Sequence, residues 1–220
     1  AWAAGDSRAK GFLLGATSGR TTLNGEGLQH QDGHSHILAS TIPNCRSYDP
    51  CYSYELAAII QEGIKDMYEE RNDRYYYITL MNENYSHPEK PKQLKNEDIL
   101  KGAYKYKEHK KANLRILASG VTLNFALEAE KELKKYEINT EIWSITSFNE
   151  LYREGIETER LNRLNSTSNQ SYVQNCFNKD IPTIAVSEYQ RAYPNQIREW
   201  VKGDYVILGT DGFGRSDTRE

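Results

Sequence analysis

The sequence predicts an α/β protein with two domains, each built on a mainly parallel sheet flanked by helices. Three observations support this prediction. A helix pattern precedes a strand pattern over residues 51–81, strand and helix patterns alternate over residues 112–220, and a polar stretch separates the two regions. Such alternation is typical of parallel sheets, because a parallel pair of strands needs a long crossover connection that is usually a helix.

The first region opens with a short helical pattern at residues 1–4 and then carries one long helix. Asp49 suits an N-cap and Pro50 suits the first helical position, so this helix is predicted at residues 51–70. Its apolar residues recur at helical spacing and indicate one buried face: Leu56, Ile59, Ile60, Ile64, Met67 and Tyr68. Residues 74–81 are predicted to form a strand, because aromatic and β-branched side chains dominate there.

The region after this strand is predicted to connect the two domains. Residues 82–111 are mostly polar, contain two prolines and show little periodic apolar content. We therefore expect a first domain at residues 1–88, a linker at residues 89–111 and a second domain at residues 112–220.

The second region alternates strand and helix patterns. Four segments rich in apolar and β-branched residues predict strands, at residues 114–120, 140–145, 181–186 and 205–209. Helical patterns between them predict helices at residues 121–136, 148–164 and 193–201. Ligands of such sheets bind at the loops that follow the carboxyl ends of the strands, so we expect functional residues there.

Composition excludes several classes of protein. The net charge is −3 and no basic stripe occurs, so nucleic acid is not expected as a partner. No apolar run approaches the ~20 residues of a membrane span, and no signal-peptide pattern opens the chain. We therefore expect a soluble, cytoplasmic protein without a membrane partner. The three cysteines lack metal-ligand spacing and are expected to be reduced thiols.

The clearest candidate for a functional segment is residues 19–36, with the sequence GRTTLNGEGLQHQDGHSH. It holds three of the five histidines and four of the fifteen glycines of the chain, without apolar periodicity. The segment is therefore expected to lie outside the core, as an active-site loop whose imidazoles hydrogen-bond and move protons near neutral pH. A solvated polar loop without a function is the alternative interpretation.

Three known site patterns are nearly matched. His30 and His34 have the i, i+4 spacing of a zinc site, but Gly33 argues against the helix that this spacing needs. Residues 25–30 nearly match the dinucleotide-binding motif, but a histidine replaces its third glycine and no apolar strand precedes it. Residues 209–216 nearly match a P-loop, but an arginine replaces its lysine. A tight turn at a domain interface, with glycines at positive φ, is the better interpretation of that last segment.

Several motifs together resemble one known family. They are GRTTLNGEGLQHQDGHSH at residues 19–36, IPNC and YDP at residues 42–45 and 48–50, NENY at residues 82–85, and LGTDGFGRSD at residues 208–217. In this order and with similar gaps, they resemble the homodimeric bacterial pyruvate dehydrogenases, the thiamine-diphosphate-dependent first component of that complex. The resemblance covers essentially the whole chain.

The resemblance implies a transketolase-like fold and a position within a longer polypeptide. Residues 1–88 would be the latter part of the domain that binds the pyrimidine of thiamine diphosphate, and residues 112–220 a truncated transketolase-like C-terminal domain. The ligands of the diphosphate and of Mg²⁺ would lie outside this chain, which is expected to hold no metal itself. The parent enzyme would be a homodimer.

The resemblance also implies a reaction, which is the oxidative decarboxylation of pyruvate with transfer of the acetyl group to a lipoyl group of dihydrolipoyl acetyltransferase. His30 matches the family's histidine beside the bound substrate adduct and is the expected catalytic residue. Asp32 and His36 match residues that hold the substrate in related transketolases, so they are candidate substrate-binding residues. Two alternatives remain open: another transketolase-like or 2-oxo-acid dehydrogenase enzyme, and a non-catalytic dimerisation or assembly module. The fragment alone is expected to be inactive.

Overall fold

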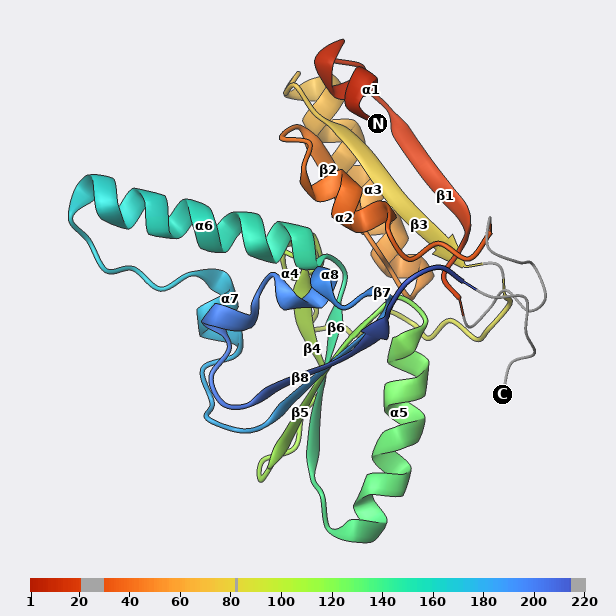
Figure 1. The fold of residues 1–220 in the computed structure, drawn as a ribbon, viewed down its shortest axis with the longest axis vertical. Coiled ribbons are helices and arrows are strands. Elements are labelled where there is room, and N and C mark those ends of the chain that lie inside the picture. The colour runs from red at the N-terminus through yellow and green to blue at the C-terminus, as the bar shows by residue number, and fades with distance from the viewer. Residues whose placement is uncertain (21–29, 82, 215–220) are drawn as a thin grey trace.

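The computed structural model describes residues 1–20, 30–81 and 83–214, which fold into two lobes with one sheet each (Figure 1). Within these residues, the first lobe has a three-stranded parallel sheet in the order β1-β3-β2. Its strands are β1 (Phe12–Ser18), β2 (Cys45–Tyr48) and β3 (Tyr75–Met81). The described part of the second lobe has a five-stranded sheet in the order β4-β6-β5-β7-β8. Its strands are β4 (Ala103–Lys107), β5 (Leu114–Ser119), β6 (Thr140–Ile145), β7 (Thr183–Gln190) and β8 (Tyr205–Thr210).

Helices flank both sheets. The first lobe has α1 (Trp2–Asp6), α2 (Ser35–Ser40) and α3 (Ser53–Ile64), which continues as a π-helical turn at Lys65–Glu69. The remaining helices are α4 (Asn96–Leu100), α5 (Thr122–Leu133), α6 (Phe148–Asn165), α7 (Tyr172–Cys176) and α8 (Ala192–Asn195). Short 3₁₀ turns follow α5 at Lys134–Tyr136 and α8 at Arg198–Trp200. The predicted α/β class with mainly parallel sheets is therefore confirmed.

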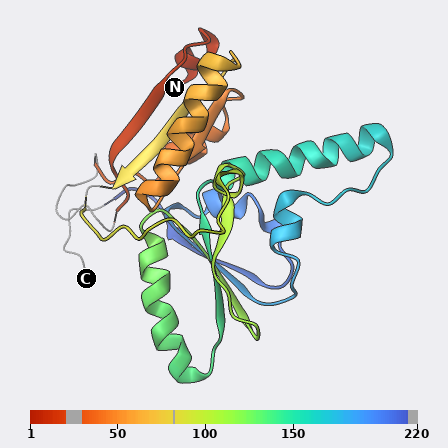
Figure 2. The ribbon, with the colours of Figure 1, turned by 180° about the vertical axis from the view of Figure 1, so that it is seen from behind.

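The second sheet is covered on both faces, and the core residues show how. Ile116 of β5 packs in one cluster with Leu123 of α5, whereas the next residue, Leu117, packs in another cluster with Phe148 of α6. Because successive side chains of a strand point to opposite faces, α5 and α6 lie on opposite sides of the sheet. Figures 1 and 2 show the same arrangement, with the far end of α6 extending away from both sheets.

The first lobe confirms the predicted long helix and the strand that follows it, but the helix begins later than predicted. Its N-cap is Tyr52, and the side chain of Glu55 accepts the backbone N–H of Tyr52 in a capping box. Asp49, predicted as the N-cap, lies outside the helix and is fully buried. The prediction used Pro50 as the first helical residue, but Cys51 and Tyr52 separate Pro50 from the first residue of the helix, Ser53.

The segment expected to be a linker, residues 89–111, contains regular structure. It carries α4 and then β4, which pairs antiparallel with β6 at the edge of the second sheet. The side chain of Ile99 is fully buried in the core of the first lobe. The sequence pattern did not indicate β4, because its lysines make it polar, which is a common property of strands at a sheet edge.

The second lobe confirms the four predicted strands and two of the three predicted helices. The third, predicted at residues 193–201, is only one short helix followed by a 3₁₀ turn. Pro194 lies within α8 and has no N–H to donate, which opposes a longer helix. All three cysteines are free, as predicted: Cys45 and Cys51 are buried and Cys176 is half-buried. No helix in the described part of the chain has both the length and the apolar character to cross a membrane.

The two lobes meet where strands of both sheets end. Asp49, directly after β2, donates its backbone N–H to the carbonyl of Thr146, which follows β6, at 2.8 Å. The carbonyl of Asp49 in turn accepts the N–H of Gly120, which follows β5, at 3.0 Å. We call this region the lobe junction. It brings together loops from the carboxyl ends of the parallel strands of both sheets, which is where ligand sites of such folds form.

Candidate functional site

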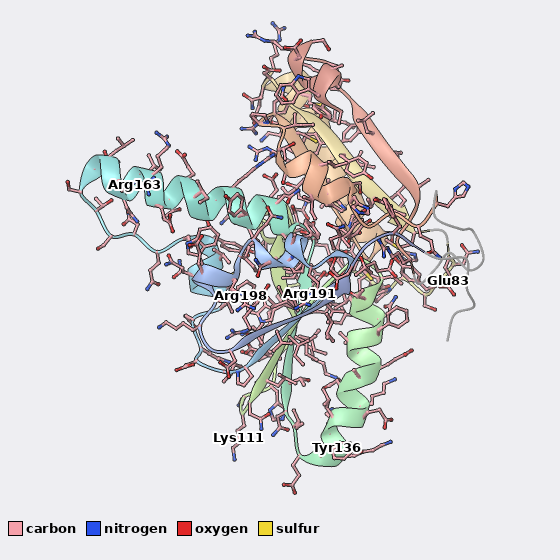
Figure 3. The ribbon with its side chains drawn as sticks, in the orientation of Figure 1. Glu83, Lys111, Tyr136, Arg163, Arg191 and Arg198 are labelled. Carbon is pink, nitrogen blue, oxygen red and sulfur yellow. The ribbon has the colours of Figure 1, made fainter. Side chains whose placement is uncertain are left out.

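The described parts of the histidine-glycine segment are residues 19–20 and 30–36, and residues 30–36 lie at the lobe junction. Its Gly33 carbonyl accepts the N–H of Gln190, the last residue of β7, at 2.9 Å. Figure 3 shows Glu83, which follows β3, on the same side of the molecule as the junction, whereas Lys111 and Tyr136 lie at the opposite end of the second lobe. The segment therefore lies at the end of the sheets at which a site is expected.

His30 and Asp32 occupy different environments within this segment. His30 is exposed at the start of the described part, and residues 21–29 lie outside it. Asp32 is half-buried, and its Oδ1 accepts the backbone N–H groups of His34 at 2.9 Å and Ser35 at 3.0 Å. The other carboxylate oxygen accepts the Ser35 hydroxyl. Asp32 thus accepts the backbone N–H groups at the start of α2 and fixes the backbone two residues after His30.

His36 is part of the core, so the prediction that the whole segment lies outside the core is wrong at this position. Its side chain is fully buried, and Nε2 lies 3.0 Å from Oγ1 of Thr79 in β3. Burial lowers the pKa of His36 to about 3, with the nearby carboxylate of Asp32 opposing the shift. The imidazole is therefore neutral at physiological pH and acts through hydrogen bonds instead of charge.

Aromatic rings from both lobes enclose His36. Tyr193 of α8 stacks on the imidazole with 4.9 Å between centroids, and Tyr189 of β7 meets it edge-on at 4.6 Å. Tyr77 of β3 lies 5.5 Å away on the first-lobe side. The His36 carbonyl also accepts a hydrogen bond from Nδ2 of Asn149 in α6 at 2.8 Å. The hydrophobic pattern of the sequence did not predict that Tyr189 or Tyr193 contacts this segment. Such a pattern reports contacts within one element, whereas these contacts join the two lobes.

Asp49 connects to His36 through Thr79. The Thr79 hydroxyl donates to Oδ1 of Asp49 at 2.7 Å. Burial raises the pKa of the Asp49 carboxyl to about 7, and hydrogen bonds from Thr79 and Ser119 oppose that rise. Sequence reasoning missed both Asp49 and Thr79 as members of the site, because it assigned Asp49 to a helix cap and Thr79 to an ordinary strand position.

The turn after β8 packs against the histidine-glycine segment. Nη2 of Arg20 donates to the Gly212 carbonyl at 2.7 Å, and the rings of His34 and Phe213 lie 5.7 Å apart. Gly212 has φ +65°, as expected for a glycine turn at a domain interface. A Cβ on Gly33 would lie 2.2 Å from Arg20 Nη2, so a larger residue at this position would displace the guanidinium group of Arg20. The near P-loop match ends at residues 215 and 216, which lie outside the described residues.

The structure therefore does not bring the three histidines to one point. His30 is exposed, His34 contacts Phe213 and His36 is buried. His34 is the N-cap of α2, so His30 and His34 do not share a helix. Among the described residues, no group of three or more His, Cys, Asp or Glu side chains is arranged to hold a metal ion.

Replacing Gly120 with alanine should destabilise the lobe junction. Gly120 has φ +55°, and an added Cβ would lie 2.8 Å from both carboxylate oxygens of Asp49. We expect a loss of about 1–3 kcal/mol in the free energy of unfolding, measured by calorimetry of the full-length protein. Gly212→Ala is the matched control, because it has a similar φ of +65° but no described atom within 4 Å of its Cβ. Equal losses in the two variants would show that contact with Asp49 contributes nothing.

Two family models match the chain. The model of the pyruvate dehydrogenase E1 component middle domain matches residues 1–88, and that of the transketolase-like C-terminal domain matches residues 102–220. The boundary between the matches falls before β4, in agreement with the pairing of β4 with the second sheet.

Curated relatives match along the whole chain. The pyruvate dehydrogenase E1 component of Pseudomonas aeruginosa is 55% identical over 100% of this chain, which covers 26% of that protein. The component of the same name from Escherichia coli is 50% identical over 100% of the chain and 25% of its own length. The one from Mycolicibacterium smegmatis is 48% identical over 99% of the chain and 24% of its own length. The chain thus spans about a quarter of the length of these relatives.

Solved transketolases share the fold. The Campylobacter jejuni transketolase aligns with a TM-score of 0.68 at 19% identity, covering 94% of this chain and 28% of its own. The Leishmania mexicana transketolase aligns with a TM-score of 0.66 at 18% identity, covering 93% and 26%. At such identities the likeness concerns the fold alone. The family models and the curated relatives show that the chain belongs to the pyruvate dehydrogenase E1 component family, and the solved structures show that its fold is transketolase-like.

Proposed function

We propose that this chain forms one wall of the active site of a pyruvate dehydrogenase E1 component. The longer enzyme would decarboxylate pyruvate oxidatively and acetylate the lipoyl group of a dihydrolipoyl acetyltransferase. One observation carries this proposal: relatives with that name are about half identical to the chain along its whole length. The position of the histidine-glycine segment at the carboxyl ends of both sheets supports it.

Thiamine diphosphate is the cofactor that the proposal requires, and it would supply the electron sink for the decarboxylation. We propose that the ligands of its diphosphate and of Mg²⁺ belong to parts of the enzyme beyond this chain. The lobe junction fits a shared site, because His30 is exposed directly before Gln31, whose side chain lies against Gly214 in the turn after β8. The chain's own contribution would be to orient the substrate and to move protons.

His30 is the residue to which we assign catalysis. As an exposed imidazole on a capped, anchored segment, it can hydrogen-bond a substrate oxygen and transfer a proton. For Asp32 and His36 we propose positioning roles instead of the substrate contacts implied by the resemblance. The oxygens of Asp32 already accept hydrogen bonds from α2, and the imidazole of His36 is fully enclosed.

The assembly of the parent enzyme belongs to the same proposal. We propose a homodimer in the cytoplasm that meets an acetyltransferase subunit and takes pyruvate as its substrate. We also propose that residues 1–88 complete the pyrimidine-binding domain and that the second lobe forms the transketolase-like C-terminal domain. The division between them would then fall close to α4 and β4, where the family matches change.

Replacing His30 with alanine in the full-length enzyme should lower the turnover of acetyl transfer at least tenfold, as is usual when a general acid or base is lost. Turnover would be measured as reductive acetylation of a lipoyl domain with pyruvate as substrate. His109→Ala is the control, because this histidine lies in the loop between β4 and β5, beyond the lobe junction. Turnover that is unchanged by His30→Ala would contradict the assigned role.

Substrate comparison tests the two alternative functions. Preference of the full-length protein for a longer 2-oxo acid or a sugar phosphate over pyruvate would indicate another transketolase-like or 2-oxo-acid dehydrogenase enzyme. Absence of any turnover, with an intact dimer and bound acetyltransferase, would indicate an assembly module. Tight Mg²⁺-dependent binding of thiamine diphosphate by the 220-residue chain alone would contradict our placement of the cofactor ligands.

A further inference from the structure

We propose that Asp49, Thr79 and His36 form a hydrogen-bonded relay that positions the histidine-glycine segment and sets the tautomer of His36. The inference rests on the function proposed above, since it concerns positioning residues for that reaction. The three side chains come from different places in the chain: after β2, within β3 and within α2. His36 Nε2 lies 3.0 Å from Thr79 Oγ1, which lies 2.7 Å from Asp49 Oδ1.

The Thr79 hydroxyl has a single proton, and its position determines the direction of the hydrogen bonds in the relay. A hydroxyl has one proton to donate and can accept as well. Its nearer acceptor is Oδ1 of Asp49 at 2.7 Å, whereas the Tyr48 carbonyl lies 3.3 Å away. With its proton directed to the Asp49 carboxylate, the Thr79 oxygen accepts a hydrogen bond from His36. The proton of the neutral imidazole then lies on Nε2, and Nδ1 is left as an acceptor.

The tautomer of His36 decides whether its second ring nitrogen, Nδ1, accepts or donates a hydrogen bond. Nδ1 is buried, and no described residue hydrogen-bonds to it. Burial of an acceptor without a partner is unfavourable, so this atom is suited to a donor that comes from outside the described residues. With the proton on Nδ1 instead, this nitrogen would be a donor, and it could no longer accept a hydrogen bond from such a group.

The relay also anchors the segment that carries His30. Asp49 is tied through its backbone to Gly120 and Thr146 of the second lobe, and Thr79 lies in the central strand of the first sheet. His36 is held between these anchors and the stacked ring of Tyr193. Because α2 is short and Asp32 holds the backbone N–H groups at its start, a displacement of His36 is transmitted to the backbone near His30. A shift of about 1 Å at a catalytic group can lower a rate a hundredfold.

The surroundings of Asp49 make the relay sensitive to pH. Thr79 of β3 and Ser119 of β5 hydrogen-bond its carboxyl group, while Glu55 of α3 and Asp32 of the histidine-glycine segment add negative charge. The phenols that interact with Asp49 include Tyr77 of β3, Tyr85 after β3, Tyr189 of β7 and Tyr193 of α8, and the Cys51 thiol interacts with it as well. Burial raises the pKa of each of these groups.

The pKa of Asp49, about 7 and raised mainly by burial, sets the pH range in which the relay would change. Once protonated, Asp49 donates to Thr79, so that Thr79 donates to His36 Nε2 and the tautomer reverses. Above this pKa the carboxylate keeps the proton on Nε2. The fraction of His36 that carries its proton on Nε2 should therefore increase as the pH rises through neutrality.

The test uses the full-length enzyme with Thr79→Val, Thr79→Ser and Asp49→Asn. We expect Thr79→Val to lower kcat roughly tenfold or more, with KM changed less than threefold, because positioning and not binding is lost. Thr79→Ser keeps the hydroxyl and should restore kcat to within threefold of the original enzyme. Thr140→Val controls for removal of a buried threonine hydroxyl, since no described group hydrogen-bonds to Thr140 Oγ1; its kcat should be unchanged.

The pH profile and the imidazole spectrum provide readouts that a merely structural role would not change. The rise of kcat with pH through neutrality should be absent in Asp49→Asn. Nitrogen-15 spectra of histidine-labelled enzyme should show the proton of His36 on Nε2 at pH 8. An active enzyme in which Thr79→Val and Asp49→Asn keep the original kcat and pH profile would overturn the relay. Absence of pyruvate turnover in the unaltered enzyme would instead overturn the proposed function, so the two failures are distinguishable.

Discussion

Replacing Arg115 with methionine should lower the free energy of unfolding of the second lobe by about 3–5 kcal/mol, the usual cost of breaking a buried ion pair. The side chain of Arg115 is 0% exposed, and Nε donates to Oε1 of Glu141, itself 1% exposed, at 2.8 Å. Its other nitrogens donate to the Thr183 hydroxyl and the Lys179 carbonyl, both at 3.1 Å. Methionine would leave these acceptors without the donor around which they are arranged.

Calorimetry of the full-length protein would measure this effect as a fall of roughly 6–20 °C in the transition of the second lobe. The control is Arg160→Met in α6, because Arg160 pairs with Glu157 at the surface, where such pairs contribute little. Comparable losses in the two variants would contradict a special contribution from burial. We expect no direct effect on activity, since Arg115 is the second residue of β5 and lies at the end of the sheet remote from the lobe junction.

The hydrogen-bonded cluster around Arg115 and Glu141 also predicts that the stability of the second lobe falls in acid. Burial alone would raise the pKa of Glu141, but hydrogen bonds from Lys179, Arg115 and Trp143 hold it below its ordinary value. A carboxyl group with a lowered pKa in the folded state stabilises the fold above its unfolded pKa. This stabilisation is therefore complete at neutral pH and is lost as the pH falls below the ordinary glutamate value of about 4.3. The acid sensitivity should be smaller in Arg115→Met.

Replacing Glu55 with alanine should have a similarly large effect, a loss of about 3–5 kcal/mol, because several buried donors lose their acceptor at once. Oε2 accepts the backbone N–H groups of Cys51 at 2.6 Å and Tyr52 at 2.8 Å. Oε1 accepts the hydroxyls of Tyr104 and Ser144, both at 2.6 Å. Glu55 thus caps its own helix and joins it to β4 and β6 of the other sheet.

Glu55→Gln is the matched variant and should be far milder. Burial raises the pKa of Glu55, with the hydrogen bonds of Ser144 and Tyr104 opposing the rise, so an uncharged side chain is tolerated there. The glutamine oxygen can accept the two backbone N–H groups, and its amide can donate to the two hydroxyls after they rotate. Thermal unfolding of both variants in the full-length protein would check this. A loss in Glu55→Gln equal to that in Glu55→Ala would show that the negative charge itself is required.

The sequence predicted the elements whose patterns are local. The helix that includes α3 and the π-helical turn carries apolar residues at helical spacing, and the four strands β5 to β8 carry dense apolar and β-branched residues. The helix start was misplaced, because a proline after an aspartate is a frequent but not a unique start signal. The edge strand β4 escaped prediction, since alternation with lysine resembles a polar linker.

The candidate site was predicted in part. The density of histidines and glycines, with the resemblance it carries, indicated the segment at residues 19–36, of which residues 21–29 lie outside the described residues. Within the described part, composition did not separate an exposed His30 from a fully buried His36. The two side chains are only six positions apart, and their environments differ because β3, β7 and α8 enclose one and not the other.

The sequence by itself determined the fold class, the family and the segment in which function is to be sought, because hydrophobic period and motif spacing are properties of the chain. Only the tertiary structure decided which groups act together. The relay consists of residues from three different places in the chain: Asp49, Thr79 and His36. These residues meet because the carboxyl ends of both sheets converge at the lobe junction. The raised pKa of Asp49 and the lowered pKa of His36 follow from that burial, which no local pattern encodes.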